Sequence, residues 1–165
     1  MMKPTLVIAI ALVLALGACT NDSTATTEPG SVDCLQPPQS ELRPASEFEI
    51  AVLPNPVESG SLASLSVEYD RADGSDITGV AASWECWDGA GWAQTHVIAR
   101  AFNESPPAVY DSTQGNVAIP DIGLVVPHSH EIVIPEVAAG TYRLTDIIYS
   151  DGRELTGRVI VEVSG

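Results

Sequence analysis

Alternation of apolar and polar residues over short runs is the feature that most limits how this chain can fold. In the clearest run, apolar residues stand at every second position: Ala63, Leu65, Val67 and Tyr69. Such alternation is typical of a strand with one face in a protein core, whereas a helix repeats its apolar positions every three to four residues. No stretch longer than about ten residues shows that helical period. The pattern therefore predicts an all-β fold.

Several stretches have this strand pattern, and turn-forming residues separate them. We expect strands at 48–52, 63–69, 80–87, 92–101, 130–134, 140–149 and 155–163, with a further short strand at 117–119. The expected turns include Asp73-Gly74, Asp88-Gly89-Ala90-Gly91 and Ser150-Asp151-Gly152, and residues 102–115 form a longer loop. Seven or eight short strands joined in this way are typical of an antiparallel, immunoglobulin-like (Ig-like) β-sandwich. We place this domain at residues 46–165.

The N-terminus has the composition of a cleavable secretory signal. A short start containing Lys3 precedes an uninterrupted apolar run from Leu6 to Leu16. This run is much shorter than the roughly 20 residues that a helix needs to span a bilayer. We therefore assign residues 1–18 to a signal peptide.

The signal ends in Leu16-Gly17-Ala18-Cys19, which resembles the lipobox of bacterial lipoproteins at every position. The resemblance implies that the chain is cut before Cys19, that its sulfur receives a diacylglyceryl group, and that its new amine is usually acylated. It also implies a location on the extracytoplasmic face of a membrane in the cell envelope. The alternative is an ordinary secretory signal in which the cysteine occurs by chance.

Behind the signal, charge and composition limit the range of partners. Residues 19–45 begin with a polar stretch that has nothing to bury, and we assign them to the lipidated cysteine and a flexible linker. Lys3 is the only lysine, so the mature chain has six arginines against 22 acidic residues, a formal charge of −16. This balance argues against nucleic acid and anionic lipid as direct partners, because both need clustered cations.

Two cysteines remain once Cys19 is assigned to the anchor. Outside the membrane thiols oxidise, so Cys34 and Cys86 are expected to form a disulfide that pins the entry segment to a central strand. Closing a loop of about 50 residues stabilises a fold by roughly 4 kcal/mol in the chain-entropy model. The alternative, a metal site with two thiolates, fits neither their separation nor the compartment.

Three further motifs resemble a known class of domain. They are Pro54-Asn55-Pro56 before a strand, Asp88-Gly89-Ala90-Gly91-Trp92 in mid-domain, and Ala139-Gly140-Thr141-Tyr142-Arg143-Leu144 before a valine-rich last strand. Together they resemble the bacterial Ig-like domains of envelope lipoproteins, over about residues 46–163. The resemblance implies an architecture and little mechanism, and the disulfide departs from it. Tyr142, near the start of a late strand, is expected to form a structural tyrosine corner.

The aromatic residues around the turn at 88–91 form the first candidate binding site. If this turn closes a hairpin, Trp87 lies opposite Trp92, Glu85 opposite Gln94, and Ser83 opposite His96. The core face then carries Val80, Ala82, Trp84, Cys86, Ala93, Val97 and Ala99. The outer face carries the candidate residues Trp87, Trp92, Glu85, Gln94 and His96, a set that can seat a peptide or a sugar ring. The favoured alternative is a cross-strand pair that only stiffens the sheet, or Trp92 covered by a neighbouring loop.

The second candidate is a metal site at His128 and His130, which share one face of an extended segment. Such a pair can contribute to a Zn²⁺ or Cu²⁺ site, which makes divalent-metal handling the alternative function. Two histidines fill only half of a tetrahedral site, so our default interpretation is two surface histidines and no metal. Residues 70–76 are acidic but lack the spacing of a calcium loop, and we expect a solvated turn there.

No catalytic signature occurs in the sequence. It contains no Gly-Xaa-Ser-Xaa-Gly, no His-Glu-Xaa-Xaa-His and no phosphate-binding loop. We therefore expect a binding or structural module without enzymatic activity or a cofactor.

Overall fold

The computed structural model describes residues 32–68, 78–79, 81–100, 106–114, 124–125, 128–150 and 152–165. The expected signal peptide, the anchor Cys19, the strand at 117–119 and the turn at 70–76 lie outside these residues.

The described chain folds into β-strands and two short 3-10 turns, so the predicted all-β class is correct. The loop expected at 102–115 is wrong in part, because residues 108–111 form a strand paired with the strand at 92–99 and residues 112–114 form a 3-10 turn. The longer strands are β1 (Glu49–Leu53), β3 (Leu62–Glu68), β5 (Ala81–Trp87), β6 (Trp92–Ala99), β7 (Ala108–Asp111), β9 (Ser129–Val133), β10 (Gly140–Ser150) and β11 (Arg153–Ser164). Two-residue strands are β2 (Val57–Glu58), β4 (Thr78–Gly79) and β8 (Leu124–Val125), and the 3-10 turns are η1 (Gln39–Leu42) and η2 (Ser112–Gln114).

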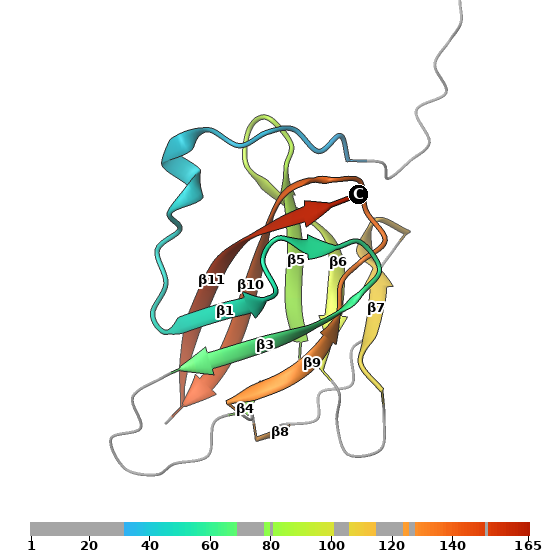
Figure 1. Ribbon diagram of the computed structural model, residues 1–165. Helices are drawn as coiled ribbons and strands as arrows, with labels where there is room; N and C mark the ends of the chain where they lie inside the picture. The colour runs from blue at the N-terminus through green and yellow to red at the C-terminus, as the bar shows by residue number, and fades with distance from the viewer. Residues whose placement is uncertain are drawn as a thin grey trace, which may run out of the picture.

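These strands form two sheets that face each other (Figure 1). The small sheet has the order β1-β3-β9, and the large sheet runs β2-β11-β10-β5-β6-β7. In addition, β4 pairs with β10, and β8 pairs with β4. All pairings are antiparallel except that of β2 with β11. The predicted Ig-like β-sandwich with one disulfide is therefore confirmed.

Alternate residues of both sheets fill the space between them. Val52, Leu65, Trp84 and Leu144 come from four different strands, and none is more than 2% exposed. Leu65 and Trp84 stand at positions that the sequence alternation assigns to a core face. Burial of these apolar side chains is the main favourable contribution to the free energy of folding.

One ion pair also lies inside the sandwich. The guanidinium of Arg100, just after β6, contacts the carboxylate of Asp146 in β10, and both side chains are buried. Burial raises the pKa of the Asp146 carboxyl, and the neighbouring Arg100 opposes that shift. Removing two charges from water costs free energy, so each buried charge needs the attraction of its partner to offset that cost.

The domain begins earlier than residue 46, where we placed its boundary. Residues 34–47, which we name the strap, cross one end of the large sheet and then run down beside β11 before β1 starts (Figure 1). Leu35 forms a β-bridge with Trp87, and the backbone N–H of Glu47 donates to the carbonyl oxygen of Thr156 at 2.8 Å. The C-terminal part of the predicted linker is therefore part of the folded domain.

Candidate functional site

The hairpin of β5 and β6 carries the aromatic candidates. As predicted, Trp87 lies opposite Trp92 and Glu85 opposite Gln94. The two indole rings meet edge to face, with centroids 5.8 Å apart. In the turn between them, the Oδ1 atom of Asp88 accepts hydrogen bonds from the backbone N–H groups of the third and fourth turn residues, at 2.8 and 2.7 Å. These two bonds lower the pKa of the Asp88 carboxyl.

A β-bulge in β6 places His96 on a different side of the sheet from the one we predicted. Ser83 pairs with Val97 and Trp84 pairs with His96, because Thr95 is an extra residue in β6 that has no partner in β5. The Thr95 hydroxyl donates to the carbonyl oxygen of Trp84 at 3.3 Å. Each bulge reverses the alternation beyond it.

The reversal moves three residues to the other side of the sheet. His96 faces the same side as the buried Trp84, so its assignment to the outer face was wrong. Val97 and Ala99 lie opposite Ser83 and Ala81, on the outer side, although we expected them on the core face. Val97 is nevertheless buried there. Ile98 takes the core position instead and is fully buried.

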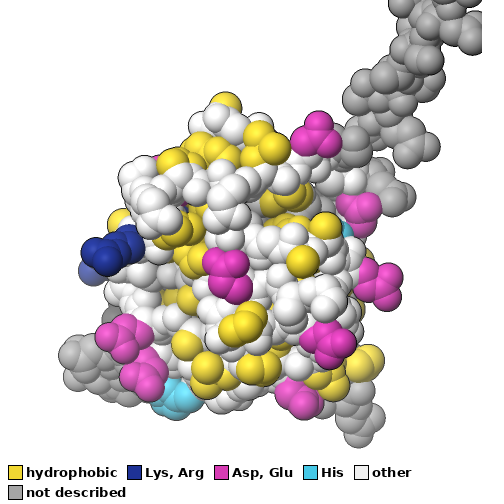
Figure 2. Space-filling view, turned by 45° about the horizontal axis from the view of Figure 1, so that its top comes forward, with side chains coloured by type: hydrophobic (Ala, Val, Ile, Leu, Met, Phe, Trp, Pro, Cys, Tyr) yellow, Lys and Arg dark blue, Asp and Glu magenta, His cyan; other side chains and the backbone are white. Residues whose placement is uncertain are grey.

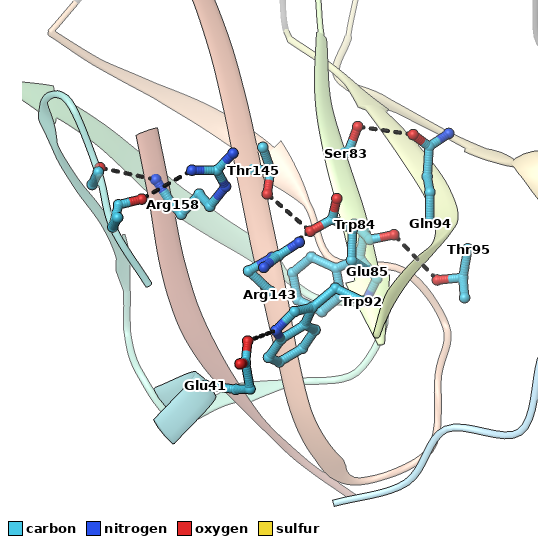
Figure 3. A network of polar contacts seen from close by, with 12 residues as sticks. Glu41, Ser83, Trp84, Glu85, Trp92, Gln94, Thr95, Arg143, Thr145 and Arg158 are labelled. Carbon is cyan, nitrogen blue, oxygen red and sulfur yellow. Dashed lines mark hydrogen bonds and ion pairs between the residues drawn. The ribbon is translucent and has the colours of Figure 1, made fainter. Parts of the chain in front are cut away.

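A polar network crosses the outer face between β5 and β10 (Figure 3). Arg143 forms an ion pair with Glu85, which also accepts a hydrogen bond from the Thr145 hydroxyl at 2.9 Å. The Arg143 guanidinium carbon lies 4.7 Å from the centroid of the Trp92 ring, a cation–π geometry. The side chains of Arg143 and Glu85 are only 16% and 13% exposed.

The strap covers Trp92 from the outside. The indole N–H of Trp92 donates to the Glu41 carboxylate at 3.1 Å, and Glu41 belongs to η1 (Figure 3). Nearby, Gln36 donates to the Thr141 hydroxyl at 3.1 Å. Trp87 and Trp92 are therefore both half-buried, and Gln94 is the exposed member of the candidate set. The arrangement matches the favoured alternative, a packed aromatic pair under a neighbouring segment.

Sequence reasoning did not select Arg143, Thr145 and Glu41. Arg143 and Thr145 alternate with the apolar Tyr142 and Leu144, so their outward direction was visible in the sequence. Their contact with Glu85 depends on β10 lying next to β5, and strand neighbours that are distant in sequence leave no local signal.

The predicted disulfide and tyrosine corner are both present. Cys34 and Cys86 are bonded, with their Cα atoms 5.3 Å apart. The Tyr142 hydroxyl donates to the carbonyl oxygen of Ala138 at 2.9 Å, which is the contact of a tyrosine corner. Burial of this phenol raises its pKa. These groups hold the start of β10 and the start of the strap at one end of the sandwich.

A cavity of about 380 Å³ opens beside the disulfide. Its lining includes Asp33, Cys34, His96, Asp111 and Tyr142. Burial lowers the pKa of His96, and the nearby carboxylate of Asp111 opposes that shift. The Asp111 carboxylate also accepts hydrogen bonds from the backbone N–H and the hydroxyl of Thr113, at 2.8 and 2.6 Å.

The two histidines of the metal candidate lie at the start of β9. The Nδ1 atom of His128 is 3.4 Å from the carbonyl oxygen of Val67, and His130 is half-buried opposite Leu65. Within the described residues, no three histidine, cysteine or acidic side chains are grouped so that they could hold a metal ion.

No protein-family model matches the chain, and no curated protein is similar to it in sequence. Among solved structures, murine CRIg is similar over 71% of this chain and 96% of its own, with 14% identity and a TM-score of 0.39. None of the helices in the described ranges has the length and apolar character to cross a bilayer.

Proposed function

We propose that this chain is an extracytoplasmic lipoprotein of the cell envelope, attached to a membrane through Cys19. Its Ig-like domain binds or spaces other envelope components and carries out no chemistry of its own. The proposal joins the lipobox-like ending of residues 16–19 to the disulfide of the folded domain.

The disulfide is the observation that carries this proposal. Disulfides persist in oxidising compartments outside the cytoplasm, which is where a signal peptide delivers a chain. The bond also uses two of the three cysteines in the sequence, Cys34 and Cys86. Cys19 is then the one cysteine left for lipidation, and it stands where a lipobox requires it. Durable attachment follows from more than one acyl chain, since each buried CH₂ contributes about 0.8 kcal/mol.

Metabolic labelling with a palmitate analogue tests the anchor. The wild-type chain should incorporate the label and remain with the membrane fraction, whereas Cys19→Ser should incorporate none. The matched control is the double variant Cys34→Ser/Cys86→Ser, which also removes cysteines but should keep the label. A labelled Cys19→Ser variant would contradict the proposal, as would a wild-type chain whose mature N-terminus lies at another residue.

A further inference from the structure

The outer face of the small sheet is not covered by any segment that the structure describes (Figure 1). Its residues alternate with the buried Val52, Leu65 and Ile132, and so point away from the core. We name them the small-sheet face: Glu49, Ala51, Leu53, Leu62, Ser64, Ser66, Glu68, Ser129, Glu131 and Val133. The large sheet, in contrast, has its outer face partly covered by the strap.

One end of the small-sheet face is apolar. Leu53 and Leu62 are each 59% exposed, the highest values among the large hydrophobic side chains described. Leu53 pairs with Ser64, two residues along β3 from Leu62, so the two leucines are diagonal neighbours. Val133 lies directly opposite Leu62. Neighbouring exposed apolar side chains on a flat sheet favour contact with another surface.

Small side chains occupy the middle of the face. The residues there are Ala51, Ser64, Ser66 and Ser129, and the hydroxyls of Ser64 and Ser129 are 2.9 Å apart. Because these four side chains are short, a second surface can approach this part of the sheet closely, beside the longer Glu131 that lies opposite Ser64. Close approach is what allows an interface to exclude water from its centre.

The other end of the face is acidic. Glu49 and Glu68 lie directly opposite each other in the register of β1 and β3. Like charges in that position destabilise a sheet. The two ion pairs of the described residues join Arg100 to Asp146 and Arg143 to Glu85, so neither of them includes Glu49 or Glu68.

Among the described residues, one basic side chain lies near the two glutamates. They line a groove of about 490 Å³ together with Arg158, whose guanidinium donates to the carbonyl oxygen of Ala45 at 3.0 Å. In Figure 2, which views the molecule obliquely from this side, acidic side chains are spread over the surface and basic ones are seen at one margin.

We propose that the small-sheet face is the docking surface for a basic protein of the envelope. The partner places apolar side chains over Leu53 and Leu62, and lysine or arginine over Glu49 and Glu68. It thereby relieves the repulsion between the two carboxylates. A second copy of this chain offers no lysine or arginine from its own small-sheet face, and anionic lipid repels the acidic end. This inference rests on the proposed function, because it assumes a domain displayed to other envelope proteins.

Binding of a defined peptide to the full-length chain in detergent tests the proposal. The probe is a fluorescent peptide of alternating lysine and leucine, and the comparison peptide carries glutamate in place of lysine. Fluorescence anisotropy should show binding of the lysine peptide alone, weakening as salt is added. Glu49→Gln/Glu68→Gln should reduce its affinity by about tenfold, as expected when two charge contacts are lost.

Matched variants separate this face from the general negative charge of the chain. Asp33→Asn/Glu154→Gln also removes two exposed carboxylates but none on the face, and should change affinity by less than about twofold. Leu53→Ser should weaken binding, whereas Leu35→Ser, at a leucine 53% exposed outside the face, should not. Equal losses in the face and control variants, or no loss in either, would overturn the proposal. So would a dimer of the wild-type chain that Leu53→Ser abolishes.

The outcome is independent of the anchor test. Peptide binding in detergent does not require Cys19 to be lipidated, and palmitate labelling does not require the small-sheet face. A failed peptide experiment with a labelled wild-type chain would therefore reject the docking surface alone.

Discussion

The indole ring of Trp84 stacks on the phenol ring of Tyr142, with centroids 5.3 Å apart and planes inclined by 26°. The pair joins β5 to β10 at the centre of the large sheet, beside the buried sulfur of Cys86. Two aromatic rings and a disulfide pack together here, so this part of the core can adapt little when one of its side chains is truncated.

Trp84→Ala and Trp87→Ala should have clearly different effects on stability. Trp84 is fully buried, so its truncation should lower the free energy of unfolding by about 3–5 kcal/mol. Trp87 is half-buried and contacts Trp92 edge to face, so its truncation should cost about 1 kcal/mol. Urea unfolding of both variants measures the difference. Equally large losses would show that Trp87 also packs as a core residue.

Gly157→Ala should destabilise the fold through Phe48. A Cβ atom at Gly157 would lie 2.2 to 2.9 Å from three atoms of the buried Phe48 ring, so the ring would have to move. Overpacking of this kind costs about 1–3 kcal/mol. Gly91→Ala is the control, because a Cβ there meets no atom within 4 Å and should change stability by less than about 0.5 kcal/mol. A thermal melt in which both variants match the wild type would contradict the expected clash.

Asp146→Ala should be strongly destabilising because it leaves Arg100 charged and buried. Breaking a buried ion pair from one side costs about 3–5 kcal/mol. The double variant Arg100→Met/Asp146→Leu should recover most of that loss, since it removes both charges and fills the space with apolar atoms. Chemical unfolding of the single and double variants tests this. A double variant as unstable as Asp146→Ala would show that the pair has a role beyond mutual neutralisation.

His96 should make stability depend on pH. Burial lowers its folded-state pKa below 6.5, so the unfolded chain binds a proton more readily than the folded one. Its contribution to stability is therefore present above about pH 6.5 and lost as the pH falls toward the folded-state pKa. His96→Gln lacks this contribution. The stability of the wild type relative to His96→Gln should decrease between about pH 7.5 and 5.5. A difference independent of pH would contradict the burial of this imidazole.

Most of the fold could be predicted from alternation, and the main error shows where alternation is not sufficient. In the middle of β5, the polar Ser83 and Glu85 alternate with apolar residues, so the core positions Trp84 and Cys86 were assigned correctly. In β6, Val97 and Ile98 are adjacent apolar residues, and the strand could continue in either phase after Thr95. The bulge at Thr95 determines which of the two phases the strand follows. The sequence signal for it was this pair of neighbouring apolar residues.

The cover over Trp92 could not be predicted for a different reason. The strap is rich in proline and polar residues and shows no period, which is also typical of a flexible linker. It is held in place by contacts with residues far along the chain, such as Gln36 with Thr141 and Glu41 with Trp92. Such contacts depend on the finished sandwich and leave no local pattern.

The bond between Cys34 and Cys86 also has a consequence for proteolysis. Every peptide bond between these two residues lies within a covalent ring. A protease that cuts once inside the ring opens it but leaves both products joined through the sulfur atoms. Such a nicked chain would stay attached to whatever its N-terminus is attached to, and its separation into two fragments would require a reductant as well as the cut.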